Sequence, residues 1–147
     1  MMNFALTEKQ RLIQQAAREF AERELAPGAQ ERDITEEFPM DILKKLGDAG
    51  LIGVQFPKEY GGQGGDYLSF VLVVEELCKV DSAFGIAYAI SSTFATGVYT
   101  FGSEEQKMHC LPRLFAGEAL GCFGLTEPDA GSDAGAAKTT ATRDGDN

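Results

Sequence analysis

The sequence predicts a mainly α-helical fold: an N-terminal bundle of five or six helices that leads into the first strands of a β domain. Apolar residues recur at helical spacing, two capping boxes mark helix starts, and strand-like alternation begins only near Gly121. We therefore expect an α-helical domain over residues 1–121 and the start of an incomplete β domain over residues 122–147.

The first helix is expected to begin at a capping box over residues 7–10, where the Thr7 hydroxyl accepts a hydrogen bond from the Gln10 amide. Pro27 and Gly28 then end this helix. Its apolar face is formed by residues at helical spacing: Ile13, Ala16, Ala17, Phe20, Ala21 and Leu25.

A second helix is expected to start near Pro39, which suits a first helical turn. The run 51–56 is short and apolar, so it fits either a helix or a strand. The glycine-rich residues 61–65 match neither a dinucleotide-binding nor a P-loop pattern, and they predict a flexible loop.

A third helix is expected over Tyr67–Val80, with Asp66 as its cap. It is apolar almost all round, and the adjacent acids Glu75 and Glu76 are expected on its exposed surface. Neighbouring residues on a helix diverge, so these two carboxylates are not predicted to act as an acid–base pair.

The next helix is expected to begin at Ser82, because residues 82–103 contain no charged side chain. Hydroxyl residues interrupt every apolar run, which favours the central helix of a soluble bundle over a membrane span. A second capping box at residues 103–106 opens a shorter helix, which Pro112 is expected to break or restart.

Composition limits the possible functions. The formal net charge of −10 disfavours nucleic acid and anionic membranes as partners. A single histidine, His109, and three scattered cysteines cannot form a zinc site. The cysteines contain no C-x-x-C pair and no secretory signal is recognisable, so we expect a cytoplasmic protein.

The character of the sequence changes after Gly121. Residues 122–126 and 138–143 are expected to form strands, and Asp144-Gly145 is typical of a hairpin turn. The chain stops before the return strand of this hairpin, so the sequence looks like part of a longer protein.

The segment 125–133 is the only stretch with the marks of a binding site. Thr126 and Ser132 supply hydroxyl groups, and Gly131 allows a ligand to approach the backbone closely. The spacing of Asp129 and Asp133 does not fit a calcium loop. Local chemistry alone leaves two readings open, a loop that binds a polar ligand and an ordinary turn.

Residues 121–136, GCFGLTEPDAGSDAGA, closely resemble the signature of acyl-CoA dehydrogenases, flavoproteins that oxidise acyl-CoA thioesters to trans-2-enoyl-CoA. The resemblance covers essentially the whole chain and is greatest to short-chain, butyryl-CoA-type members. It extends to these upstream motifs: Phe4-x-Leu6-Thr7-x-x-Gln10, Pro57-Lys58-Glu59-Tyr60-Gly61-Gly62, Val74-Glu75-Glu76-Leu77, Gly102-x-Glu104-Glu105-Gln106-Lys107 and Leu111-Pro112.

The resemblance implies an FAD site along Phe123–Ser132, with Phe123 and Gly124 lining the flavin. Leu125 and Thr126 match positions at the pyrimidine edge of the flavin. Gly131 and Ser132 match positions near the pyrophosphate, and Ser132 also matches a contact to the CoA substrate. The helix around Ala89 matches the wall of the acyl cavity.

The resemblance also implies what this chain does not supply. The catalytic base of the family is a glutamate in a C-terminal helical domain beyond Asn147, so no residue here is assigned that role. Family members are commonly homotetramers that pass electrons to an electron-transfer flavoprotein. Two alternatives stay open: a stand-alone helical module that binds acyl-CoA or a protein, and a relative with other flavin chemistry such as nitroalkane oxidation or hydroxylation.

Overall fold

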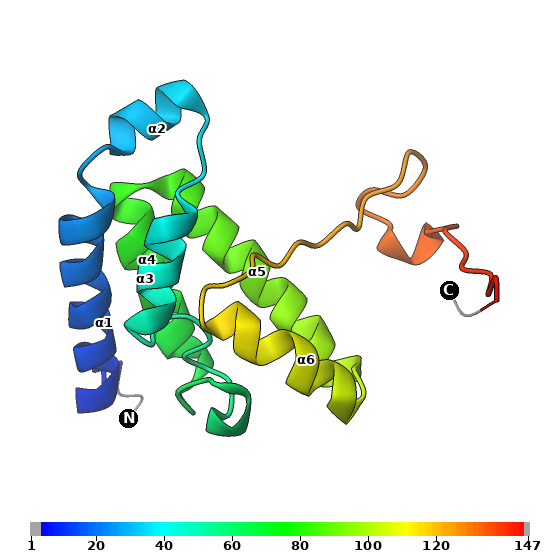
Figure 1. Cartoon of the computed structure of the whole chain (residues 1–147), viewed down its shortest axis with the longest axis horizontal. Coiled ribbons are helices and arrows are strands. Elements are labelled where there is room, and N and C mark those ends of the chain that lie inside the picture. The colour runs from blue at the N-terminus through cyan, green and yellow to red at the C-terminus, as the bar shows by residue number, and fades with distance from the viewer. Residues whose placement is uncertain (1–3, 146–147) are drawn as a thin grey trace.

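The computed structural model describes residues 4–145, so the outermost residues of both expected parts, 1–3 and 146–147, lie outside the description. The mainly α-helical prediction is confirmed, with helix α4 packed between α1 and α5 and with α6 packed against α5 (Figure 1). The helices are α1 Glu8–Phe20, α2 Ala29–Thr35, α3 Met40–Asp48, α4 Tyr67–Val80, α5 Ser82–Phe101 and α6 Glu104–Phe115. Three shorter turns are the π-helix Ala21–Leu25 and the 3-10 helices Lys58–Tyr60 and Ala134–Ala136.

The predicted helix caps are confirmed. The Gln10 backbone N–H donates to Thr7 Oγ1 at 3.2 Å, and the Thr7 N–H donates to Gln10 Oε1 at 2.9 Å. The same reciprocal pair closes the start of α6 at Ser103 and Gln106. These bonds satisfy backbone donors that a helix start leaves unpaired, so the sequence fixes where α1 and α6 begin.

Two helical details differ from the sequence prediction. Helix α2 was not expected, and none of its residues is buried, which explains why it has no apolar periodicity to detect. Pro112 neither breaks nor restarts a helix but lies inside α6. The backbone hydrogen bond that Pro112 cannot donate is offset by burial of its neighbours Leu111, Leu114 and Phe115.

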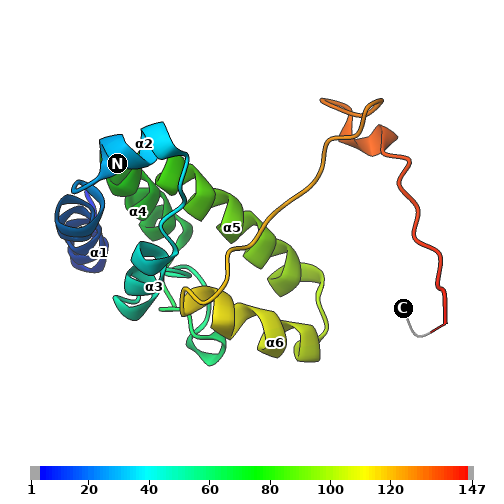
Figure 2. The same cartoon turned by 45° about the horizontal axis from the view of Figure 1, so that its top comes forward.

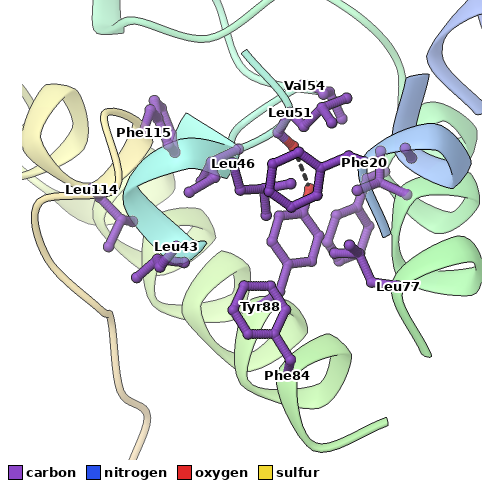
Figure 3. Close-up of a cluster of buried hydrophobic side chains, with 14 of the residues drawn as sticks. Phe20, Leu43, Leu46, Leu51, Val54, Leu77, Phe84, Tyr88, Leu114 and Phe115 are labelled. Atoms are coloured by element: carbon purple, nitrogen blue, oxygen red, sulfur yellow. Dashed lines mark hydrogen bonds between the residues drawn. The ribbon is translucent and has the colours of Figure 1, made fainter. Parts of the chain in front are cut away.

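The core lies where α1, α3, α4 and α5 meet. Figure 3 shows Tyr88 at its centre, with its hydroxyl donating to the Leu51 carbonyl at 3.0 Å. Burial of this phenol raises its pKa. The surrounding side chains are apolar and buried: Phe20, Leu43, Leu46, Val54, Leu77, Phe84, Leu114 and Phe115.

The glycine-rich residues 61–65 form a packed loop and not the flexible one that the sequence predicted. A Cβ on Gly62 would lie 2.2 Å from the Phe56 carbonyl oxygen, and one on Gly65 would lie 2.5 Å from that of Val54. The Gly64 and Gly65 amides donate to these same two carbonyls at 2.8 and 2.7 Å. These glycines therefore allow two backbone segments to approach closely.

One residue, Asp81, joins the two longest helices. It follows the last residue of α4, and its carboxylate accepts from the Phe84 N–H at 3.0 Å to cap α5. The same carboxylate accepts from Arg32 Nη2 at 3.0 Å, and that nitrogen also donates to the Leu25 carbonyl at 2.6 Å. Asp81 thus ties the α4–α5 connection to the end of the first helix.

Glu76 also differs from the sequence prediction, because it is buried and not on the surface. Its side chain is 2% exposed and forms a two-point ion pair with Arg18, with both N–O distances at 3.0 Å. Lys79 and Gln14 donate to it as well, at 2.9 and 3.0 Å. The Arg18 hydrogen bond is the main reason that the pKa of Glu76 falls to about 2. This cluster links α1 to α4.

Candidate functional site

The segment predicted to carry the site leaves the helical domain at Gly121 and runs away from it (Figure 2). Within the described residues, no hydrogen bond or ion pair joins residues 123–145 to the helices. The segment is therefore anchored at its beginning only.

The anchor lies between α5 and α6. The Gly121 N–H donates to Ser91 Oγ at 3.0 Å, and both residues are buried. Next to it is an open cleft of about 260 Å³, lined by Phe94, Cys110, Arg113 and other residues of α6 and the connection 119–122. The Ser91 hydroxyl therefore contacts the Gly121 backbone.

Residues 122–126 were predicted as a strand, and the structure does not form one. No hydrogen bond reaches their backbone from any described residue, because this part of the chain offers no neighbouring strand. Phe123 and Leu125 are 52% and 50% exposed, and Gly124 and Thr126 are exposed as well. The segment thus presents apolar side chains together with free backbone donors and acceptors.

The loop that follows is held by its own contacts. Glu127 and Ala130 exchange two backbone hydrogen bonds, at 3.0 and 3.1 Å, and Ala130 is buried. The Glu127 carboxylate accepts from the backbone N–H groups of Lys138 and Thr139, at 2.7 and 3.0 Å. The bond from Lys138 is the first cause of the lowered pKa of Glu127. The loop is therefore held by its own hydrogen bonds, while the two residues expected to contact a ligand are exposed to solvent.

Those two candidates are Gly131 and Ser132. A Cβ on Gly131 would meet no atom within 4 Å, and Ser132 is exposed. A flat ligand can therefore approach this backbone without steric obstruction. The second predicted strand, residues 138–143, is also absent, since within the described chain its only backbone hydrogen bonds go to the Glu127 carboxylate.

The remaining candidate, Ala89, lies on α5. It is half-buried and packs against the core, in contrast to the exposed residues 122–126. The same helix exposes Ile86 and Ile90, which are 59% and 44% accessible. These two isoleucines were not singled out from the sequence, although their i, i+4 spacing places them on one face.

Other kinds of site find no support. The part of the chain covered by the structure, residues 4–145, contains no group of three His, Cys, Asp or Glu side chains able to hold a metal ion. Across the same residues, every helix is too short or too polar to cross a lipid bilayer.

Comparison with known proteins gives the family. Residues 7–118 match the family model for the acyl-CoA dehydrogenase N-terminal domain. The short-chain-specific acyl-CoA dehydrogenase of Clostridium acetobutylicum is 49% identical over 146 residues, which are 99% of this chain but 38% of that protein. The chain thus spans well under half the length of the curated relatives it matches.

Solved structures agree. Butyryl-CoA dehydrogenase from Megasphaera elsdenii superposes with a TM-score of 0.88 at 40% identity, over 99% of this chain and 39% of that one. A chain in a structure of the electron transferring flavoprotein of Acidaminococcus fermentans gives 0.92 at 49% identity, over 99% of this chain and 38% of that one. Glutaryl-CoA dehydrogenase from Mycobacterium smegmatis in complex with FADH2 gives 0.87 at 37%, over 95% and 36%. The chain therefore belongs to the acyl-CoA dehydrogenase family and corresponds to its N-terminal domain.

Proposed function

We propose that this chain is the N-terminal part of an FAD-dependent acyl-CoA dehydrogenase that converts short acyl-CoA thioesters to trans-2-enoyl-CoA. Two relatives, each of which matches 99% of this chain, are named as short-chain-specific and butyryl-CoA enzymes. The observation that carries the proposal is the segment 122–132, which follows the matched domain. Its residues 122–126 and 131–132 are exposed, and the backbone of 122–126 has no hydrogen bond to any described residue.

The chemistry of this segment fits a flavin. The isoalloxazine ring is flat and largely apolar, with a hydrogen-bonding pyrimidine edge. Phe123 and Leu125 offer apolar contact, and the Leu125 backbone and the Thr126 hydroxyl offer hydrogen bonds. We assign Phe123, Gly124, Leu125 and Thr126 to the ring. All four are exposed, so the ring can reach them without rearranging the core.

We assign Gly131 and Ser132 to the FAD pyrophosphate. The open space at Gly131 lets a phosphate approach the backbone, and the Ser132 hydroxyl can donate to a phosphate oxygen. Ser132 also contacts the CoA substrate in this proposal. The acyl chain lies along α5, near Ala89 and the exposed Ile86 and Ile90.

The division of labour follows from these positions. When bound, FAD supplies the acceptor for the hydride that leaves the substrate β-carbon. The described residues bind and orient: Thr126 fixes the ring edge, Ser132 holds the phosphate side, and α5 shields the acyl chain from water. We assign the base that removes the α-proton to the C-terminal helical domain of the family and to none of the described residues. We therefore expect the isolated chain to be catalytically inactive.

The assembly belongs to the same proposal. We propose a homotetramer that passes electrons to an electron-transfer flavoprotein or a similar acceptor. The match to a chain in an electron transferring flavoprotein structure supports the acceptor only. Three free thiols, Cys78, Cys110 and Cys122, are compatible with the reducing cytoplasm.

A hybrid enzyme tests the proposal. This chain replaces the matching 146 residues of the Clostridium acetobutylicum dehydrogenase, so that the relative supplies the base and the rest of the FAD site. We expect the purified hybrid to retain FAD, to show bleaching of the flavin absorbance on addition of butyryl-CoA, and to turn over with an artificial electron acceptor.

The isolated chain and the parent enzyme of the hybrid are the controls. A folded hybrid without flavin would refute the proposal. Flavin bleaching by a nitroalkane in place of butyryl-CoA would replace it with other flavin chemistry. Tight butyryl-CoA binding by the isolated chain would instead support a stand-alone binding module.

A further inference from the structure

The segment 121–126 and helix α5 are joined at one point, the hydrogen bond from the Gly121 N–H to Ser91 Oγ. Its length is 3.0 Å and Ser91 is only 5% exposed, so water does not compete for either group. Among the described residues, this is the last hydrogen bond between the helical domain and the chain that continues to Phe123.

Close packing of Gly121 against Phe94 holds the chain at the same place. A Cβ on Gly121 would lie 2.8 Å from Phe94 Cδ1 and 2.9 Å from Phe94 Cβ, closer than side chains normally approach. Only glycine lets the backbone pass this close to the ring. Ser91 and Phe94 are three residues apart on α5, so they hold Gly121 from neighbouring positions on the helix surface.

The position of Ser91 on α5 determines what the hydrogen bond to Gly121 holds together. Ser91 faces inward, while the preceding residue, Ile90, is 44% exposed on the face we assign to the acyl chain. Phe123, at the start of the segment assigned to the flavin, is only two residues beyond Gly121. One hydrogen bond therefore relates the acyl-side helix to the flavin-side segment.

We propose that Ser91 is a positioning residue that sets where residues 123–126 begin relative to α5, and hence where the flavin lies relative to the acyl chain. The flavin part of this inference rests on the proposed function. Ser91 touches neither ligand in this arrangement and acts only through the backbone of Gly121.

The chain itself provides the first test. In Ser91→Ala, hydrogen exchange of the Gly121 amide should become at least roughly tenfold faster, because a buried backbone donor loses its acceptor. Ser92→Ala is the matched control: it removes the neighbouring hydroxyl, which accepts from Gln55 Nε2 at 2.7 Å and not from Gly121. Unchanged protection of Gly121 in Ser91→Ala would overturn the inference.

The hybrid enzyme provides the second test. Ser91→Ala should lower kcat by roughly three- to tenfold with a smaller change in KM. The substitution leaves substrate binding largely intact, but in the bound complex the flavin and the acyl chain are no longer aligned. Ser91→Thr keeps the hydroxyl and should restore most of the rate, and Ser92→Ala should not separate kcat from KM. A purely structural role would lower the amount of folded enzyme and leave kcat per bound flavin unchanged, which would refute the coupling.

The two proposals fail in different ways. If the unsubstituted hybrid holds no FAD, the proposed function is wrong, and exchange of the Gly121 amide alone decides whether Ser91 positions the segment. If that hybrid is active while Ser91→Ala matches it in exchange, kcat and KM, the positioning role is wrong and the proposed function stands.

Discussion

The helical part of the molecule and the segment 121–145 differ in what holds them in place. Residues 8–115 form six helices around a shared apolar core, whereas residues 123–145 have no hydrogen bond to that core within the described chain. The ligand candidates, except Ala89, all lie in the second part. Stability and ligand chemistry are thus assigned to separate stretches of sequence, and substitutions should separate them too.

The largest effect on folding is expected from Leu77→Ala in α4. Leu77 is completely buried, so the change leaves a cavity and should lower the free energy of unfolding by about 2–5 kcal/mol. Urea denaturation of the chain measures this. Leu68→Ala is the control on the same helix, because Leu68 is 46% exposed and should cost about 0.5 kcal/mol or less. Equal losses in the two variants would contradict the assigned core.

A smaller loss is expected from Glu76→Gln, because Arg18 and Lys79 then face a neutral group. We expect a decrease of about 1–3 kcal/mol at neutral pH. The folded-state pKa of about 2 lies below the ordinary value of 4.5, so the ionised carboxylate stabilises the fold above pH 4.5. That contribution is lost as the pH falls from 4.5 to about 2.

Urea denaturation of the original chain and of Glu76→Gln between pH 4.5 and about 2 tests the direction of this pH dependence. The difference between the original chain and Glu76→Gln should shrink as the pH falls. Glu75→Gln serves as the control, since the Glu75 side chain is 50% exposed and pairs with Lys79 on the surface. A difference that grows on acidification would show that Glu76 is not held ionised by Arg18.

Removal of residues 122–147 should change stability very little. The helical domain keeps its core and its Ser91–Gly121 bond, so we expect a free energy of unfolding within about 0.5 kcal/mol of the full chain. Denaturation of the shortened chain tests the predicted boundary at Gly121. A clear loss of stability would mean that the segment contributes to the core and that the two parts are not separate.

The smallest effect on stability, and the largest on ligand binding, is expected from Thr126→Ala. The residue is exposed, so unfolding of the chain should not change measurably. In the hybrid enzyme the lost hydroxyl should weaken FAD binding by roughly three- to tenfold. Flavin content after gel filtration measures this, and Cys110→Ser on α6 should retain full flavin. Equal flavin content in the two variants would show that Thr126 does not contact the ring.

Sequence reasoning succeeded where a local rule governs the structure. Capping boxes gave the starts of α1 and α6, the Asp66 cap and an apolar run gave α4, and the uncharged run 82–103 gave α5. Hydrogen bonds and side-chain character within a few residues decide each of these helices. It failed at α2, which has no buried apolar residue, and at the glycine loop, whose packing against Phe56 is a tertiary contact. Residues 122–126 could not become a strand without a partner strand.

The site was predictable in part for the same reason. The order of residues in 121–136 gives the candidate ligand groups, since it depends only on sequence. Burial of Glu76 and the bond between Ser91 and Gly121 depend on contacts between residues 30 or more positions apart. No periodicity or motif encodes such a pair, so structure was needed to find both.

The single-residue connection at Asp81 constrains how the length of this chain can change. Helix α5 starts at the residue after Asp81, so one inserted residue would turn it by roughly 100° about its axis if α4 stayed in place. Such a turn would point Ile86 and Ile90 away from their present direction and separate Ser91 from Gly121. Additions and deletions are therefore expected to be tolerated at the exposed end of α2, residues 33–35, and to be rejected at Arg32 and between α4 and α5.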